Sequence, residues 1–425
     1  MKASIVPNSI QTLKRKKRAF PARLLRRGLL NRLAALQHGQ VNLKDDEGCY
    51  RFGEPTEEFP HPVTIKVNSS EFYTELALGG SVGAGEAYIH GLWSCDDLTL
   101  LTRIMVRNQH VIDGMDSSLS RFKAPLHQLL HWFNRNTKKG SRRNIASHYD
   151  LGNELFSLFL DPTMMYSSAI FENDEVDLEQ ASVAKLDRIC QKLDLQASDH
   201  VLEIGTGWGG FAIHAAKHYG CRVTTTTISR EQFEYASRRI VEEGLQDSVT
   251  LLMEDYRDLQ GQYDKMVSIE MIEAIGHQYL GVYFATCDRL LKPRGMMLLQ
   301  AITIADQRYE QARRSVDFIK RFIFPGGFLP SVSAMADALA RNSDMRIYHL
   351  DDIGPHYATT VRKWRQRFFQ RIKEVKALGY PESFIRMWEF YLCYCEGGFE
   401  ERAIGTAQLL LIKPENKRAP LTSGL

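Results

Sequence analysis

Short apolar runs alternate with amphipathic segments through the middle of the chain. The runs are rich in aliphatic and β-branched residues and occur at 201–204, 221–227, 249–253, 263–270 and 295–304. Longer segments with helical periodicity separate them, and the last run follows the breaker Lys292-Pro293-Arg294-Gly295. Strands that alternate with helices in this way predict a parallel, doubly wound α/β sheet.

The turn after the first of these runs is rich in glycine. Val201-Leu-Glu-Ile-Gly-Thr-Gly-Trp-Gly-Gly210 joins a buried strand to a sharp turn, and the residues around His214 continue as a helix. Glycine adopts positive φ and lets a ligand approach the backbone closely. The spacing G-x-G-x-G after an acidic residue fits S-adenosylmethionine methyltransferases better than the G-x-G-x-x-G of dinucleotide-binding proteins. An ordinary tight turn between a strand and a helix is the alternative.

Polar side chains stand at the carboxyl ends of the predicted strands. These are Glu203, Thr227, Asp255 and the acids between Glu270 and Glu273, and Ser229 is the expected N-cap of a helix that runs to about Glu243. Ligands of open parallel sheets bind outside this edge. The rim therefore suits a cofactor with an adenosine and a charged amino-acid tail.

Length and composition narrow the class of protein. With 425 residues the chain is expected to form two domains. Its seven cysteines include no C-x-x-C pair, which disfavours a disulfide scaffold or a metal site and favours a reducing cytosol. The sequence shows no apolar run of the roughly 18–20 residues that cross a bilayer, and no signal peptide.

Basic charge is concentrated at the N-terminus. Residues 1–43 contain ten lysines and arginines and no acidic residue, and Leu25, Leu29, Leu33 and Leu36 fall on one side of a predicted helix. A basic amphipathic helix of this kind suits the surface of an anionic membrane. The alternatives are a solvated tail or a helix docked on the protein itself. Binding to nucleic acid is disfavoured, because nothing else in the chain resembles a nucleic-acid module.

Seven separated motifs carry the most specific information. They are Gly83–Asp97, which contains G-E-A-Y-x-x-G-x-W-x-x-D-D, and His148–Phe156, Met165–Ala169, Thr227–Gln232, Asp255–Asp258, Phe324–Ser331 and Tyr391–Phe399. Together they resemble the motifs of the cyclopropane fatty acid synthase family, which includes the mycolic acid methyltransferases, over about residues 45 to 415. The resemblance implies a class I methyltransferase: an α/β Rossmann-like sheet with a helical insert that covers the substrate, plus a small N-terminal α/β domain.

The resemblance and the composition together predict four parts. Residues 1–43 form the basic amphipathic tail, 44–133 the lipid-engaging N-terminal domain, 134–147 a basic linker, and 148–425 the catalytic domain. Strands are expected near Cys49–Phe52 and Val63–Val67 of the N-terminal domain. The aromatic-rich segment between residues 305 and 400 is the expected apolar tunnel for an acyl chain.

The resemblance also implies the residues that bind S-adenosylmethionine. Tyr166 and Ser167, joined by Tyr149, are expected at the methionine end, and the glycine loop is expected to wrap the cofactor. One group of residues after the second predicted strand is expected to bind the ribose, and another group after the third strand is expected to bind the adenine. The complete set is Tyr149, Tyr166, Ser167, Glu203, Gly205, Thr206, Gly207, Gly209, Thr227, Ile228, Gln232, Asp255 and Tyr256.

The implied reaction transfers the sulfonium methyl group to an olefin and then removes a proton to close a cyclopropane ring. In the family, that proton passes to a bicarbonate held by a residue at a cysteine position, a glutamate, a histidine and a tyrosine. The corresponding positions here are Ser168, Glu273, Gln300 and Tyr357. Because Gln300 cannot carry the charge of a histidine, the bicarbonate site is altered. Glu270 adds a carboxylate that could substitute for the anion; an acid at a helix start or facing solvent is the alternative.

Cys395 matches a family cysteine often described as active, but no histidine stands beside it in the sequence, so we expect it to line the acyl pocket. The predicted function is cyclopropanation of unsaturated phospholipid acyl chains at an anionic membrane, on the cytoplasmic face, by a monomer or a homodimer. A methyltransferase that makes methyl-branched or methyl-olefinic chains is the first alternative. A non-catalytic lipid-binding protein is the second, and a methyltransferase of soluble small molecules is least favoured.

Overall fold

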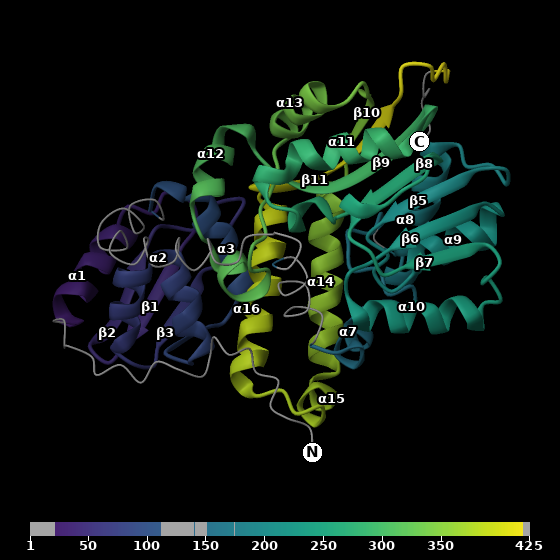
Figure 1. The fold of residues 1–425 in the computed structure, drawn as a ribbon. Coiled ribbons are helices and arrows are strands. Elements are labelled where there is room, and N and C mark those ends of the chain that lie inside the picture. Colours follow the sequence, from purple (N-terminus) through teal and green to yellow (C-terminus); the bar gives the residue numbers. More distant parts are fainter. Residues whose placement is uncertain (1–21, 112–139, 141–150, 174, 420–425) are drawn as a thin grey trace. The chain divides into compact units, whose positions relative to one another are not determined.

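The computed structural model describes residues 22–111, 140, 151–173 and 175–419, which form two compact units (Figure 1). Unit 1 comprises the described residues of 1–133 together with 314–325 and 372–403, and unit 2 comprises those of 134–313, 326–371 and 404–425. Two segments from the expected catalytic domain thus belong to the same unit as the N-terminal residues. Residues 1–21, Tyr149 and the expected linker, apart from Gly140, lie outside the described residues.

Unit 1 contains a four-stranded sheet of order β2-β1-β3-β4, in which β1 and β3 are parallel and the other pairs antiparallel. The two expected strands are present as β2 and β3, whereas β1 and β4 were not predicted. The elements are α1 (Ala22–Leu33), β1 (Val41–Asp45), β2 (Gly48–Phe52), β3 (Val63–Val67), α2 (Glu71–Ile89), β4 (Trp93–Cys95), α3 (Leu98–Arg107), η5 (Ile319–Ile323), α15 (Ile372–Ala377) and α16 (Glu382–Glu400).

The apolar side of the N-terminal helix faces protein. Leu29, Leu33 and Leu36 are all buried, and Arg26 forms an ion pair with Asp45 at 2.6 Å. Within the described part of the basic segment, the structure therefore shows a helix docked on unit 1. These buried leucines are not available for insertion into a membrane, which corrects the use that the sequence analysis made of them.

Unit 2 is built on a seven-stranded sheet of order β10-β11-β9-β8-β5-β6-β7. Strands β9, β8, β5, β6 and β7 are parallel, as predicted, whereas β11 pairs with β9 and β10 pairs with β11, both in antiparallel fashion. The strands are β5 (His200–Ile204), β6 (Arg222–Thr226), β7 (Val249–Leu252), β8 (Tyr263–Ile269), β9 (Leu291–Ile304), β10 (Arg346–Asp352) and β11 (Ile404–Ile412).

One predicted boundary differs. Strand β9 begins at Leu291 and runs through Pro293, which the sequence analysis assigned to a break between elements. Pairing with β8 jumps from Tyr263–Leu291 to Lys265–Met296 across this segment. The proline has no N–H for the ladder, so the strand tolerates it only in this irregular stretch.

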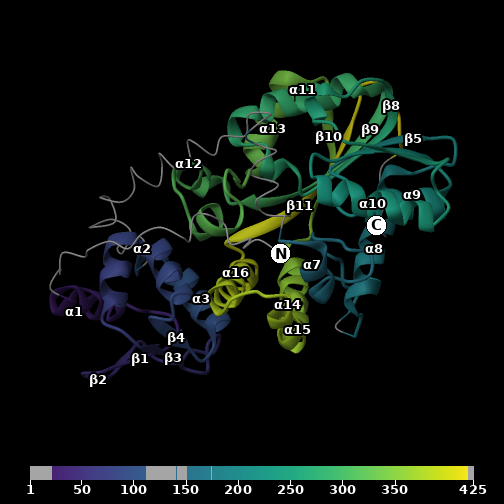
Figure 2. The same cartoon turned by 60° about the horizontal axis from the view of Figure 1, so that its bottom comes forward.

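Helices cover both faces of the sheet in unit 2 (Figure 2). Alternate residues of one strand face opposite layers: Leu202 packs with the helices α11 and α13, and Val201 packs with α8, α9 and α10. The helices and short turns are α7 (Asn153–Phe159), α8 (Leu178–Leu193), α9 (Gly210–Tyr219), α10 (Arg230–Glu242), η2 (Tyr256–Asp258), η3 (Ile272–Ala274), η4 (His277–Tyr279), α11 (Leu280–Leu290), α12 (Asp306–Arg314), α13 (Val332–Asn342) and α14 (Gly354–Gln370). The carboxyl ends of five parallel strands are thereby fixed along one rim.

No helix of the described residues has both the length and the hydropathy to span a bilayer.

Candidate active site

The glycine turn after β5 leaves space beside its backbone. Gly205, Gly207 and Gly209 have φ of +103°, +53° and +89°. The amides of Gly205 and Thr206 donate to the carbonyl of Thr226 at 3.1 and 3.0 Å, which holds the loop on β6. A Cβ added at Gly207 would meet no atom within 4 Å. The loop is thus a rigid cradle open to a ligand, and it fits the expected S-adenosylmethionine.

The expected ribose residues are organised by one another. The hydroxyl of Thr227 donates to Oε1 of Gln232 at 2.9 Å and accepts from the amide of Ser229 at 3.1 Å. Ser229 caps α10, as predicted, by accepting from the amide of Gln232. No partner among the described residues takes the side-chain nitrogen of Gln232. Together with Ile228, this leaves a donor group ready for ribose hydroxyls.

The expected adenine residues are clamped by an arginine that the sequence analysis did not single out. Asp255 accepts from Nε and Nη2 of Arg257 at 2.7 and 2.6 Å. The same guanidinium lies 5.5 Å from the ring centroids of both Tyr256 and Tyr279. A two-residue spacing of acid and arginine is the signal that could have identified this clamp.

A buried lysine lies at the methionine end of the cradle, and the acidic residue Glu203 is buried as well. Nζ of Lys185 donates to Oγ of Ser167 at 3.0 Å, and Glu203 accepts from Thr225, which shares a hydrogen bond with Thr206. Burial raises the pKa of Glu203 to about 8 and lowers the pKa of Lys185 to about 8. Lys185 lies on the apolar side of α8, and that unusual position was the missed signal.

Three of the four residues expected to hold bicarbonate converge on the side chain of Glu270. Its Oε1 accepts from the amide of Ser168 at 3.0 Å and from Nε2 of Gln300 at 2.8 Å. Its Oε2 accepts from the hydroxyl of Tyr357 at 2.6 Å. Because these donors already bind a carboxylate, the residues present do not fit a separate bicarbonate. Burial raises the pKa of Glu270, and the three hydrogen bonds oppose that shift.

Glu273, the fourth expected residue, lies close but has a different environment. Its Oε1 accepts from the amide of Ile302, and its Oε2 is buried with no hydrogen-bond partner among the residues that the structure describes. Burial and the neighbouring Glu270 raise the pKa of Glu273 to about 8. The site therefore holds two carboxyl groups: Glu270 accepts three hydrogen bonds and Glu273 accepts one.

Gln300 is part of a chain of buried amides. Its Oε1 accepts from Nε2 of Gln408 at 3.0 Å, and Oε1 of Gln408 accepts from Nζ of Lys192 at 2.8 Å. Lys192 also bonds Asp351 at 2.7 Å. This chain fixes which end of the Gln300 amide faces Glu270.

Tyr166 and Cys395 are the remaining predicted site residues in the described part of the chain. Tyr166 packs edge-on against Phe156, with ring centroids 5.2 Å apart, and lies 5.1 Å from Trp364. Cys395 is on α16 of unit 1, and burial raises the pKa of its thiol far above the usual range. Since the thiolate is the nucleophilic form of cysteine, burial disfavours that role, and the expected place of Cys395 in an acyl pocket stays a prediction. No group of His, Cys, Asp or Glu in the described chain could hold a metal ion.

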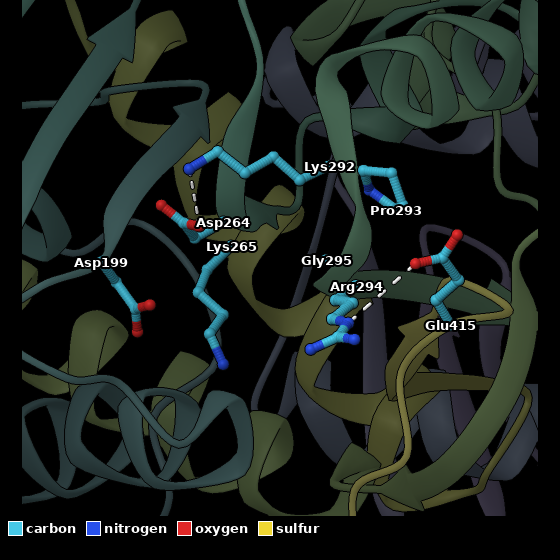
Figure 3. Close-up of a pocket in the computed structure, with 8 residues that line it drawn as sticks. All are labelled: Asp199, Asp264, Lys265, Lys292, Pro293, Arg294, Gly295 and Glu415. Atoms are coloured by element: carbon cyan, nitrogen blue, oxygen red, sulfur yellow. Dashed lines mark hydrogen bonds and ion pairs between the residues drawn. The ribbon is translucent and has the colours of Figure 1, made fainter.

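A polar cavity of about 490 Å³ lies at the opposite edge of the sheet, where β5, β8 and β9 begin (Figure 3). Lys292 points toward Asp264 there, at 2.7 Å, and Arg294 toward Glu415, at 4.0 Å. Lys265 donates to the carbonyl of Leu193 at 2.7 Å. The cavity lies at the amino ends of these strands, whereas ligands of open parallel sheets bind outside the carboxyl ends, so we do not assign the active site to it.

Unit 2 thus combines the class I methyltransferase fold with a buried pair of carboxyl groups. The mycolic acid cyclopropane synthetase family matches residues 136–409. A mycolic acid cyclopropane synthase solved with SAH and CTAB superposes with a TM-score of 0.60 at 30% identity, covering 64% of this chain and 98% of that one.

Two relatives of known function extend the match. The tuberculostearic acid methyltransferase of Mycobacterium tuberculosis is 39% identical over 352 residues, covering 79% of each chain. The cyclopropane-fatty-acyl-phospholipid synthase of Escherichia coli is 40% identical over 352 residues, covering 82% of this chain and 87% of the relative. The chain belongs to the mycolic acid cyclopropane synthetase family and is an S-adenosylmethionine-dependent methyltransferase of that type.

Proposed function

We propose that this enzyme transfers a methyl group from S-adenosylmethionine to the double bond of an unsaturated phospholipid acyl chain and converts it to a cyclopropane. The observation that carries the proposal is the position of the buried carboxyl groups. They follow β8, which pairs with β5 in parallel, and a Cβ at Gly205 would lie 3.2 Å from Met271, the residue after Glu270. The acids therefore adjoin the cofactor loop.

The chemistry requires few conventional catalytic groups. S-adenosylmethionine supplies an electrophilic methyl group when bound. The chain must hold the olefin near that methyl, within about 3–3.5 Å, in a pocket that excludes water. Carboxylates and aromatic faces stabilise the cation that forms on the acyl chain. Glu270 is such a carboxylate, and Tyr166 packs on Trp364, whose ring centroid lies 6.0 Å from that of Tyr357, the residue bonded to Glu270. A carboxylate must then receive one proton.

A second product is supported by one of the relatives. The enzyme of M. tuberculosis that is 39% identical to this chain is a tuberculostearic acid methyltransferase. Proton loss from the acyl carbon beside the cation, in place of the transferred methyl, would leave a methyl-branched olefin. Both products require the same methyl transfer and the same buried acids.

Mass spectrometry of phospholipids from cells that express the protein tests the proposal. We expect acyl chains heavier by one CH₂, with the original double bond lost and a ring present. A retained double bond beside a methyl branch would establish the second product instead. Unmodified lipids in cells that contain folded, cofactor-binding protein would contradict both.

We also propose that the basic N-terminus attracts the enzyme to anionic membranes from the cytoplasmic side. Residues 1–21 contain six lysines and arginines, and each basic residue near such a surface contributes about 1 kcal/mol. Deletion of 1–21 should weaken co-sedimentation with anionic vesicles and leave binding to neutral vesicles unchanged. Deletion of 1–43 is a poorer test, because it removes the buried Leu29 and Leu33. Equal binding by the full-length and shortened proteins at low salt would exclude this role.

A further inference from the structure

The donors around Glu270 form a receptor for one carboxylate-sized anion. They come from three separate parts of unit 2: the backbone amide of Ser168 after α7, the side-chain amide of Gln300 on β9 and the hydroxyl of Tyr357 on α14. The three donors bind both oxygens of one planar anion, two on Oε1 and one on Oε2, and leave one lone pair of Oε2 able to accept a proton. Bicarbonate has the same pair of oxygens, so the protein's own side chain and a free bicarbonate would compete for one position.

The backbone directs the Glu270 side chain into this position. Glu270 has φ of +50°, one of four such values among the described non-glycine residues. Its amide donates to the carbonyl of Gln300 at 2.8 Å, which ties it to β9. A left-handed conformation costs a non-glycine residue about 1–2 kcal/mol. Strained residues held by their surroundings concentrate at functional sites, and here the strain places a carboxylate among three donors.

We propose that Glu270 is the resident catalytic base of this enzyme and takes the place of the bicarbonate used elsewhere in the family. This inference rests on the proposed function. It assigns to the chain's own carboxylate the proton acceptor that the reaction requires.

The step balances without a further reactant. The π electrons of the olefin form the bond to the methyl carbon as the carbon–sulfur bond breaks, and its electron pair stays on sulfur. An oxygen of Glu270 then takes a proton from the transferred methyl group. The electrons of that C–H bond close the ring onto the cationic carbon, or, if the proton comes from the neighbouring acyl carbon, form a new double bond. Glu270 ends as a neutral acid, which returns its proton to solvent after product release.

Two substitutions separate the position from the chemistry. Glu270→Gly removes the carboxylate, relieves the positive φ and opens the donors to a free anion. Glu270→Gln keeps a side chain of the same shape among the donors but cannot accept the proton. Both variants should lose turnover by about 100- to 10,000-fold, the usual contribution of a general base. Bicarbonate should restore turnover only to the glycine variant.

Binding of ¹³C-labelled bicarbonate, followed by NMR, tests the inference without any turnover. We expect binding to Glu270→Gly and none to the wild-type or Glu270→Gln proteins. Binding to the wild type, or full turnover by Glu270→Gln, would overturn the proposal. Should the glycine variant fail to fold, those two measurements still decide. If the binding results hold and cells make no methylated lipid, the proposed function fails while the assignment of the anion position stands.

Discussion

The two halves of the rim in unit 2 differ in whether their binding groups are open or already occupied by the protein. At the ends of β5 and β6 the groups are unfilled: Gly207 faces open space, and the side-chain nitrogen of Gln232 has no partner among the described residues. At the ends of β8 and β9 the donors are already occupied by Glu270. One half is built to receive a ligand, and the other supplies its own. The difference separates a cofactor that is exchanged in every cycle from a base that stays.

The largest expected effect comes from blocking the open half of the rim, at the ends of β5 and β6. Asparagine tolerates positive φ, so Gly207→Asn should fold while its side chain fills the cradle. We expect affinity for S-adenosylmethionine to fall by at least about 100-fold, or about 2.7 kcal/mol, in calorimetry. Gly244→Asn is the matched control, because Gly244 also has positive φ and open space but lies after α10. Equal cofactor binding by the two variants would refute the assignment of the loop.

In the filled half of the rim, at the ends of β8 and β9, removing one hydrogen-bond donor should change the pKa of Glu270. Tyr357→Phe deletes the hydrogen bond to Oε2 of Glu270, which lowers the pKa of that acid. The pKa should therefore rise, and the acid limb of the pH–rate profile should move about one unit higher, since a charge-assisted bond contributes about 1.5–3 kcal/mol. Tyr219→Phe, which removes a hydroxyl bonded to Asp187, is the control. An unmoved limb would show that Glu270 does not limit the rate.

Glu273, whose Oε2 has no hydrogen-bond partner among the described residues, should make the free energy of unfolding depend on pH. The pKa of Glu273 is raised to about 8, so the folded protein keeps a proton that the unfolded chain releases above its usual value. The free energy of unfolding should thus fall as pH rises from about 4.5 to 8, by up to about 1.4 kcal/mol per unit from this group. Denaturant titrations of Glu273→Gln should show a shallower fall, whereas the exposed control Glu415→Gln should match the wild type. Equal slopes for all three proteins would contradict the buried, neutral state of Glu273.

Of the four changes, Gln300→His is expected to have the smallest effect, because it should leave the response of turnover to bicarbonate unchanged. Histidine would add a charge near Glu270, but the position remains filled, so the single variant should stay insensitive to the anion. Loss of the hydrogen bond from Gln408 should lower the free energy of unfolding of this variant by about 1–3 kcal/mol. Combined with Glu270→Gly, the same change should tighten bicarbonate binding relative to Glu270→Gly alone, as measured by NMR titration. A bicarbonate response in the single variant would mean that Glu270 does not block the position.

The sequence was sufficient for the parallel core and the glycine turn after β5, because both depend on local patterns. Strands such as β5 and β8 carry their own apolar residues, and the glycine turn has its own spacing. Strands β10 and β11 escaped prediction because their antiparallel pairings, β11 with β9 and β10 with β11, join segments far apart in the chain.

The site was predicted less completely for a physical reason. The sequence identified Ser168, Gln300 and Tyr357 through the family resemblance, and it raised Glu270 as a substitute carboxylate. It could not reveal that positive φ at Glu270 turns its side chain onto all three. Nor could it show the packing that buries Lys185 beside Ser167. These features arise from contacts between elements distant in the chain.

Turnover of the purified wild-type enzyme in buffer freed of carbon dioxide tests the central claim most directly. With phospholipid vesicles and S-adenosylmethionine, the rate should be the same before and after bicarbonate is restored, because Glu270 already occupies the anion position. A rate that collapses on removal of bicarbonate and recovers when it is added back would contradict the account.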